Sequence, residues 1–535
     1  MTKPFSTHSR ALTALSATAL LLASCSKPAP YEVSEVPLTQ VEADLASGKT
    51  TSEAATTAYI ERIKKYDGAL HSVILVAPDA IAQAKASDAR RKAGKPLSAL
   101  DGVPIMFKDN IDATGMPTTA GSYAFTANVP VKDSEVVRRL REAGVVILGK
   151  LNMSQFAGWR GTKGFLDGST VGGQPTNPYR VGYTTAGSSS GSGVAGAASF
   201  AAATVGSDTT GSIIGPSSLQ GLVGMRPTVA LISRRGVLPI SSIMDTTGPM
   251  ARNVTDMAAL LTVMAGSDPG DPASAEADAH KTDYQKGLAA NALKGVRLGV
   301  VRGTGNDNEK TAPVFEQALK TLTDQGAEIV DVPVSSFEDL FPEQHTLLHW
   351  TFREDLEAYL KNAPPAVKVR TLADLVAFNK ADPHESKYEQ ELWEMDLLNK
   401  GRAEPDYPRM FEYAVRRAGP EGLTAAMMQY NVSALVMVNS GPATPIAAQR
   451  TGNSGPYVNI PPKGASKLSP SGIAALAGYP DLSVPIGAID GLPIGMSLVG
   501  PKWSEQQLLS YAYAYEQVAK ARVAPTDYLK AAEKK

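Results

Sequence analysis

Short apolar runs alternate with amphipathic stretches along most of this chain, and this alternation restricts its fold more than any other feature. Residues 103–107 and 145–148 are two such runs, each with the length of a buried strand. Residues 295–301 form another, and the amphipathic stretch 311–325 separates it from a further strand-like run at 330–334. Strands that alternate with helices in this way predict an α/β fold.

Four further stretches carry helical patterns. Residues 50–53 fit a capping box, which predicts the start of a helix over 54–65. A helical pattern also follows the second apolar run and extends through Phe156. Residues 194–205 are rich in alanine and valine and predict a helix packed closely against its neighbours. Residues 340–430 are helical, charged and aromatic throughout.

The first 24 residues have the pattern of a secretory signal that is removed from the mature protein. Lys3 and Arg10 make a positive start, and residues 11–23 form an apolar run too short to cross a membrane. The sequence Leu-Ala-Ser-Cys that ends at Cys25 resembles a bacterial lipobox, which implies cleavage before Cys25 and attachment of lipid to it. A plain secretory signal with a chance cysteine is the alternative, and both interpretations predict export.

On the lipobox interpretation, residues 25–37 are a lipoprotein tether, and the protein is a periplasmic or cell-surface lipoprotein. Its partner is then the membrane, through the lipid on Cys25. Ser26 after the cysteine, rather than an aspartate, favours the outer membrane. The net charge of −1 over 535 residues provides no basic surface, so we expect no nucleic acid as a partner.

The sequence argues against two common kinds of catalytic centre, a cysteine nucleophile and a zinc site. Cys25 is the only cysteine and lies in the signal region, which excludes a cysteine nucleophile in the mature domain. A zinc site needs a cluster of His, Cys or carboxylate ligands. His345 and His349 lie one helical turn apart, but Thr346 stands where a zinc protease places its glutamate. We therefore expect a histidine pair on a helix surface and no metal site.

Residues 182–221 hold nine glycines and nine serines among forty residues. A flexible linker is one interpretation, but the alanine- and valine-rich half of the segment is unlike a linker. Residues 187–191 also match the G-x-S-x-G elbow of α/β-hydrolases. That motif follows a buried strand, and residues 183–186 would make a poor one.

Lys108 ends the apolar run 103–107, and strand ends are where an α/β sheet presents functional side chains. Burial there would lower its pKa, because desolvation penalises the ammonium form, and only a neutral lysine can accept a proton. A lysine that forms a salt bridge with Asp109 or another carboxylate is the alternative.

These segments resemble the amidase signature family in residue type and in spacing. Lys108 precedes Ser188 by 80 residues and Ser188 precedes Ser212 by 24, as in the Ser-cisSer-Lys triad of that family. The likeness runs from about residue 38 to 522. Matching motifs follow in the family's order at residues 187–192, 207–212, 224–228, 245–252, 476–480 and 491–495.

The resemblance implies one large α/β domain over residues 38–530, in which helices cover a central mixed β-sheet. It implies a catalytic core at about residues 100–260 and a helical substrate-pocket region at about 340–430. It implies neither a cofactor nor a metal ion. The expected partner is a small-molecule or peptide amide substrate.

The resemblance also implies roles for single residues. Ser212 is the nucleophile that forms an acyl-enzyme. Ser188, which follows a cis peptide bond in the family, relays the proton between Ser212 and Lys108. Gly187 suits that position because it lacks a Cβ atom.

Around the triad, the resemblance implies an oxyanion hole built from the backbone N–H groups of Thr209, Thr210 and Gly211. Asp208 is expected to orient this loop from behind, and Ser189 to form hydrogen bonds within the neighbouring turn.

Two positions depart from the family, which often has Gly-Gly-Ser-Ile-Arg around the nucleophile. Thr210 replaces a glycine and Ile214 replaces the arginine, which removes a polar anchor. In these details the motifs look closest to those of bacterial peptide amidases, which release ammonia from C-terminal peptide amides. An amidase of aryl or fatty amides, a histidine-dependent α/β-hydrolase esterase and a lipid-anchored binding protein without catalysis are the alternatives.

Overall fold

The computed structural model describes residue 1 and residues 31–161, 167–304, 306–447 and 470–533. Its centre is a sheet of eleven strands in the order β1-β3-β2-β4-β6-β5-β10-β11-β9-β7-β8. The strands are β1 (Val73–Val76), β2 (Pro104–Lys108), β3 (Val146–Leu151), β4 (Ala203–Asp208), β5 (Val223–Arg226), β6 (Thr246–Ala251), β7 (Arg297–Arg302), β8 (Glu328–Pro333), β9 (Ala434–Val438), β10 (Asp481–Ile489) and β11 (Leu492–Val499).

The sheet is mixed. Strand β2 runs parallel to β3 and β4, and β7 runs parallel to β8 and β9, whereas the other neighbours are antiparallel. Every residue of β2, β3 and β4 is buried, including Lys108 at the end of β2. Central strands of a sheet that is covered on both faces are buried along their whole length. The expected fold class, a single large α/β domain with a mixed sheet, is confirmed.

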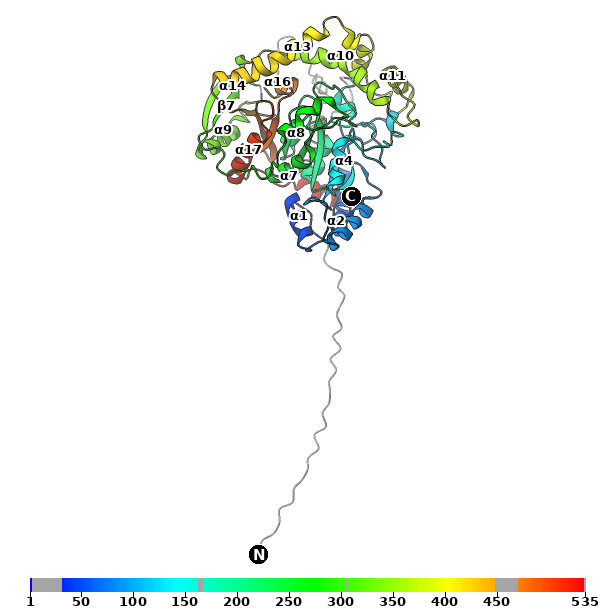
Figure 1. The fold of residues 1–535 in the computed structure, drawn as a ribbon, viewed down its shortest axis with the longest axis vertical. Helices are drawn as coiled ribbons and strands as arrows, with labels where there is room; N and C mark the ends of the chain where they lie inside the picture. Colours follow the sequence, from blue (N-terminus) through cyan, green and yellow to red (C-terminus); the bar gives the residue numbers. More distant parts are fainter. Residues whose placement is uncertain (2–30, 162–166, 305, 448–469, 534–535) are drawn as a thin grey trace.

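Long helices form at residues 54–65 and 311–325 and over 340–430, as expected, whereas those over 80–92, 254–264 and 505–519 were not predicted. Helices α10, α11 and α13 arch over one end of the molecule, and α1 and α2 lie at the opposite end (Figure 1). The helices are α1 (Leu38–Ala46), α2 (Ser52–Tyr66), α3 (Ala80–Lys92), α4 (Glu135–Glu142), α5 (Ser190–Ala197), α6 (Ile214–Leu219), α7 (Val254–Met264), α8 (Ala277–His280), α9 (Ala312–Asp324), α10 (Phe341–Leu360), α11 (Leu372–Ala381), α12 (Glu391–Asp396), α13 (Tyr407–Ala418), α14 (Ala425–Gln429), α16 (Pro470–Ala477), α17 (Glu505–Ala519) and α18 (Asp527–Glu533). Within the part of the chain that the structure describes, none of the helices is long and apolar enough to cross a bilayer.

Three local expectations were wrong. Helix α2 is capped by Thr51, whose side chain accepts from the Ala54 N–H, and not by the residue before it. The helical pattern through Phe156 is only a 3-10 turn, because Phe156 and the next residue have φ values of 49° and 54°. Residues 194–197 end α5 and residues 203–205 begin β4, while residues 198–202 connect the two. Pairing of β4 with β2 and β6 overrides the helix propensity of its alanine.

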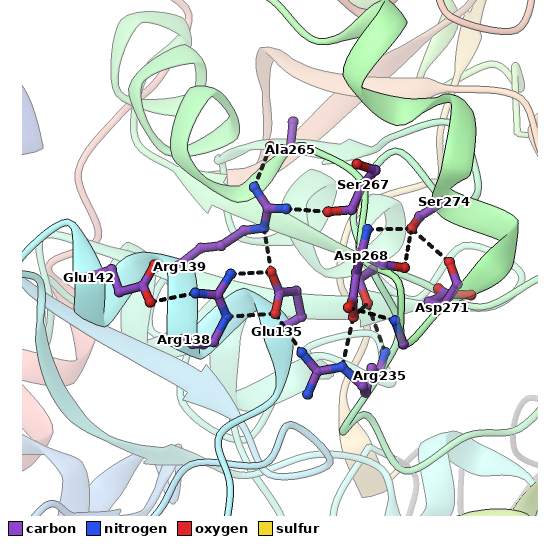
Figure 2. Close-up of polar contacts among 12 residues, drawn as sticks. Glu135, Arg138, Arg139, Glu142, Arg235, Ala265, Ser267, Asp268, Asp271 and Ser274 are labelled. Carbon is purple, nitrogen blue, oxygen red and sulfur yellow. Dashed lines mark hydrogen bonds and ion pairs between the residues drawn. The ribbon is translucent and has the colours of Figure 1, made fainter.

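A network of ion pairs anchors the start of the segment 236–245. Glu135 of α4 binds Arg139 of its own helix and Arg235, which also binds Asp268 at 2.7 Å (Figure 2). Arg139 donates further to the backbone oxygens of two residues in the loop after α7. Residues 236–245 therefore start from a fixed point on the core.

Candidate active site

Lys108 is the last residue of β2, and its side chain is completely buried. Its Nζ lies 2.7 Å from Ser188 Oγ, 2.9 Å from Ser207 Oγ and 3.0 Å from the Ser207 carbonyl oxygen. Ser207 belongs to β4, which pairs with β2, so the sheet itself brings these groups together. Ser188 comes from the loop ahead of α5.

Burial lowers the pKa of Lys108 to about 7, although the negative charges of Asp208 and Asp245 act in the opposite direction. Lys108 forms no salt bridge with any described residue. Asp109, the carboxylate considered as its partner from the sequence, is paired instead with Lys150 of β3 at 3.2 Å. The alternative of a Lys108–Asp109 salt bridge is therefore wrong.

Ser188 and Ser212 come from separate loops and line the same cavity. The Gly187–Ser188 peptide bond is cis, as the family resemblance implied. The Ser154 N–H donates to the Ser188 carbonyl oxygen at 3.1 Å, and the Ser189 N–H donates to the Ser212 carbonyl oxygen at 3.1 Å. The second of these bonds holds the two serine loops against each other, and the first ties the Ser188 loop to the segment after β3.

The loop after β4 folds around the carboxylate of Asp208, which is buried. One oxygen accepts from the Gly211 N–H at 2.8 Å, and the other accepts from the Ile213 N–H at 2.6 Å. Arg226 of β5 pairs with the same carboxylate at 2.8 Å. The Gly211 N–H was expected to face a substrate oxyanion, but here it is turned toward Asp208.

Three other N–H groups of this loop are free for a ligand. Those of Thr209, Thr210 and Ser212 form no hydrogen bond with any residue that the structure describes. The Thr209 hydroxyl donates to Asp245 at 2.6 Å. That carboxylate also accepts from the backbone N–H groups of residues 240 and 241, so it joins the loop to a second segment.

Ser189 is completely buried, and its hydroxyl donates to the Ser207 carbonyl oxygen at 2.9 Å. In a G-x-S-x-G elbow this serine would be the nucleophile with its hydroxyl facing a ligand. Residues 183–186 ahead of it form no strand. The elbow interpretation is therefore wrong, and Ser189 supports the turn.

The cavity at Ser188 and Ser212 has a volume of about 480 Å³, which suits a ligand the size of a small drug molecule. Helix α10, from the region expected to cover the pocket, contributes Phe341, Gln344, His345 and Leu348 to it. None of the described residues that line it is an aspartate, glutamate, lysine or arginine. The part of the lining that the structure describes is therefore uncharged apart from any charge on His345.

The sequence suggested that His345 and His349 lie on an exposed helix surface, and this expectation was wrong. His345 lines the cavity, and His349 is only 9 % exposed and pairs through Nδ1 with Asp396. Their metal-like spacing reflects the packing of both rings against Trp159 at 5.3 and 4.8 Å. Among the described residues there is no group of three His, Cys, Asp or Glu side chains that could hold a metal ion.

Sequence reasoning missed three residues at this site: Ser207, Asp245 and Trp159. Ser207 and Asp245 lie within motifs that were recognised, but their roles depend on contacts across the sheet and between loops.

Ile214, which stands in place of the family's arginine, is the first residue of α6 and lines the cavity. Residues 2–30, which include Cys25 and the first six residues of the tether, lie outside the described residues.

Comparisons with known proteins identify the family of this chain. The protein-family model described as Amidase matches residues 54–509. The solved structure of native peptide amidase from Stenotrophomonas maltophilia has a TM-score of 0.85 and 40 % identity, covering 92 % of this chain and 98 % of that one. A glutamyl-tRNA(Gln) amidotransferase subunit of Myxococcus xanthus is 36 % identical over 91 % of this chain and 98 % of its own length. A probable amidase of Arabidopsis thaliana is 32 % identical over 92 % of both chains.

Proposed function

Because this chain belongs to the amidase family and hydrolyses amide C–N bonds, we propose that its substrates are peptides with a C-terminal carboxamide. The products are the free peptide acid and ammonia. The observation that carries this proposal is the buried Lys108–Ser188 contact at 2.7 Å, beside Ser212 in a cavity whose described lining has no ionised acid or base.

In the proposed reaction Ser212 Oγ bonds to the carbonyl carbon while its proton passes to Ser188 and the Ser188 proton passes to Lys108. The carbonyl π electrons move to oxygen. The C–N bond then breaks with its electron pair on nitrogen, which takes a proton through Ser188 as Lys108 returns one. Ammonia leaves an acyl ester, and water hydrolyses it by the same proton path to a carboxylic acid and free Ser212.

The hydrogen bonds of Lys108 suit the neutral amine that this path requires. A neutral amine has two N–H donors and one lone pair. The Ser207 carbonyl oxygen can only accept, and the Ser207 hydroxyl can accept the second N–H while it donates to Asn110. The lone pair then faces the Ser188 hydroxyl, which supports Ser188 as the donor and Lys108 as the base.

We assign the oxyanion hole to the N–H groups of Thr209, Thr210 and Ser212. The bond from Gly211 to Asp208 removes Gly211 from the set expected from the sequence. Asp208 and Ser189 do not contact the substrate in this proposal. Asp208 fixes the curvature of the loop after β4 through its bond to the Ile213 N–H, and Ser189 ties its own turn to β4. Removal of one oxyanion donor typically lowers kcat by about 10²–10³.

The absence of Asp, Glu, Lys and Arg among the described lining residues favours peptide amides over free amino acid amides. A free amino acid amide such as glutamine carries an ammonium and a carboxylate, and both need charged partners when they are buried. A peptide amide presents a neutral backbone at the same place. The aromatic side chains Trp159 and Phe341 also suit aryl amides, which are the second candidate substrates.

Ammonia release separates these substrates and tests the mechanism. The assay compares a C-terminally amidated dipeptide, an aryl amide and a long-chain fatty amide, with Ser212→Ala and Lys108→Ala beside the wild-type enzyme. Turnover of the dipeptide amide that both variants lose supports the proposal. Turnover of only another amide discards the peptide assignment, and activity that survives Ser212→Ala discards the nucleophile.

We further propose that the protein is exported and anchored by lipid at Cys25, on the strength of the lipobox-like sequence. A fatty-acid label should enter the wild-type protein and not Cys25→Ala, and the wild type alone should sediment with membranes. Equal labelling of both proteins, or wild-type protein recovered only in the soluble fraction, contradicts the anchor.

A further inference from the structure

One wall of the active-site cavity is built from aromatic rings that pack against one another. His345 of α10 lies 5.7 Å from Phe341 with an angle of 27° between the rings, and 5.3 Å from Trp159. His349 lies one turn further along α10, and its ring centroid is 4.7 Å from that of His345. Phe341, His345 and Trp159 line the cavity that also contains Ser212. We call these three residues the ring wall.

A buried carboxylate fixes the Trp159 ring of the wall and the His349 ring behind it. Asp396 of α12 accepts from Trp159 Nε1 at 2.9 Å with one oxygen and pairs with His349 Nδ1 through the other. Its side chain is completely buried. Since the only N–H of the indole is used by Asp396, a ligand in the cavity meets only the carbon atoms of Trp159.

His345 is neutral under ordinary conditions. Burial and the neighbouring His349 lower its pKa to about 4. It forms no hydrogen bond with any described residue, and its Nε2 atom is buried without a partner. The ring wall therefore carries no charge at neutral pH, and it offers aromatic surface to a ligand.

The ring wall is also close in sequence to the catalytic groups. Ser154, whose N–H holds the Ser188 carbonyl oxygen, lies five residues before Trp159 on the same short segment. Elsewhere the cavity lining includes the amides and hydroxyls of Thr304, Asn306 and Ser440. Polar groups suit a peptide backbone, whereas the rings suit a side chain.

We propose that Trp159, Phe341 and His345 form the subsite for the side chain of the residue whose carboxamide is cleaved, and that this subsite selects apolar and aromatic side chains over charged ones. This inference rests on the proposed function, since it concerns peptide amides. A charged side chain would lose its hydration there, and none of the described lining residues is an Asp, Glu, Lys or Arg that could pair with it. An apolar or aromatic side chain gains burial and ring contacts.

A substrate panel measures this selection directly. N-acetylated leucine, phenylalanine, glutamate and lysine amides differ only in the side chain next to the cleaved bond. For the wild-type enzyme we expect kcat/KM for the leucine and phenylalanine amides to exceed that for the glutamate and lysine amides by about tenfold or more. Equal values across the panel overturn the subsite.

A charge placed on the ring wall should change the ranking. In His345→Asp a carboxylate faces the cavity, so the ratio of kcat/KM for the lysine amide to that for the leucine amide should rise at least tenfold. Phe341→Glu is a second variant, in which the new carboxylate lies in the first turn of α10, where a helix tolerates acids. His384→Asp is the matched control, because this exposed histidine stacks on Tyr123 outside the cavity.

The outcomes separate the subsite from the function on which it rests. A wild-type enzyme that cleaves none of the peptide amides overturns both. A wild-type enzyme that cleaves them, with a ranking that both folded variants leave unchanged, overturns the subsite alone. A change in ranking that His384→Asp reproduces also overturns it, because the effect would then come from charge anywhere on the protein.

Discussion

At the scale of single residues, Lys108 determines how activity should depend on pH. Burial lowers its pKa to about 7, and a protonated lysine cannot accept the Ser188 proton. As pH falls through 7 the ammonium form accumulates, so kcat/KM should decrease by close to tenfold per pH unit below 6. A pH profile of ammonia release on the dipeptide amide measures this, with folding followed by fluorescence. A value of kcat/KM that stays constant from pH 8 to 5 would contradict Lys108 as the base.

Ser207 should matter to the rate although it touches no substrate. Ser207→Ala removes one of the acceptors of the Lys108 amine and leaves the backbone oxygen. The lysine can then rotate away from Ser188, and we expect kcat to fall about tenfold with KM little changed. Ser52→Ala is the control, because Ser52 is another completely buried serine, and its hydroxyl binds the Gly102 carbonyl oxygen. A Ser207→Ala enzyme with wild-type kcat contradicts this positioning role.

The residues of the candidate site differ in how far the sequence could reveal them. Lys108, Ser188 and Ser212 were predicted because their spacing resembles that of a known family, and the structure brings Lys108 to Ser188 and both serines to one cavity. Gly211 was misassigned because the direction of its N–H depends on how the loop wraps around a carboxylate, and spacing does not encode that. Ser207 was missed because its contact with Lys108 exists only once β2 and β4 are paired.

At the scale of elements, the loop after β4 that carries Thr209, Thr210 and Ser212 is held by Asp245, the residue before β6. Thr209→Val removes the hydroxyl that donates to Asp245 at 2.6 Å and keeps the shape of the side chain. We expect kcat to fall several-fold, because the loop loses its support, and the free energy of unfolding to fall by about 1.5–3 kcal/mol. The measurements are steady-state kinetics and urea denaturation.

The matched control for that change is Thr262→Val. The hydroxyl of Thr262 donates to the Ala258 carbonyl oxygen within α7, outside the loop. Thr262→Val should lower the free energy of unfolding without lowering kcat. If both variants affect kcat equally, the effect is one of general stability and the proposed support of the loop is wrong.

Secondary structure was predictable where a hydrophobic pattern and a tertiary environment agree. The run at 103–107 and the region at 340–430 are of this kind. The pattern failed at 194–205, where alanine-rich sequence enters a sheet, and around Phe156, where the chain turns with positive φ beside the cavity. Both failures lie next to the site, where packing against distant strands decides the local conformation.

At the scale of the whole molecule, the helical region has to be attached firmly to the sheet, because α10 forms part of the active-site cavity. Glu385, between α11 and α12, provides one attachment. Its completely buried carboxylate pairs with Arg160 of the segment that carries Trp159, and it also accepts from Gln155 at 2.9 Å and from Ser122 at 3.1 Å. The sequence could not reveal this link, since the partners are more than 200 residues apart.

Glu385→Ala should therefore destabilise the whole molecule and not only one loop. The substitution leaves Arg160 buried without its counter-charge, and removal of one partner of such a pair costs about 3–5 kcal/mol. Urea denaturation should show that loss, together with a lower kcat on peptide amides because Trp159 shifts. Glu316→Ala is the control, since its pair with Arg302 is about half exposed on both sides and should contribute less than about 1 kcal/mol. If Glu385→Ala is no less stable than Glu316→Ala, the attachment of the helical region depends on its apolar core alone.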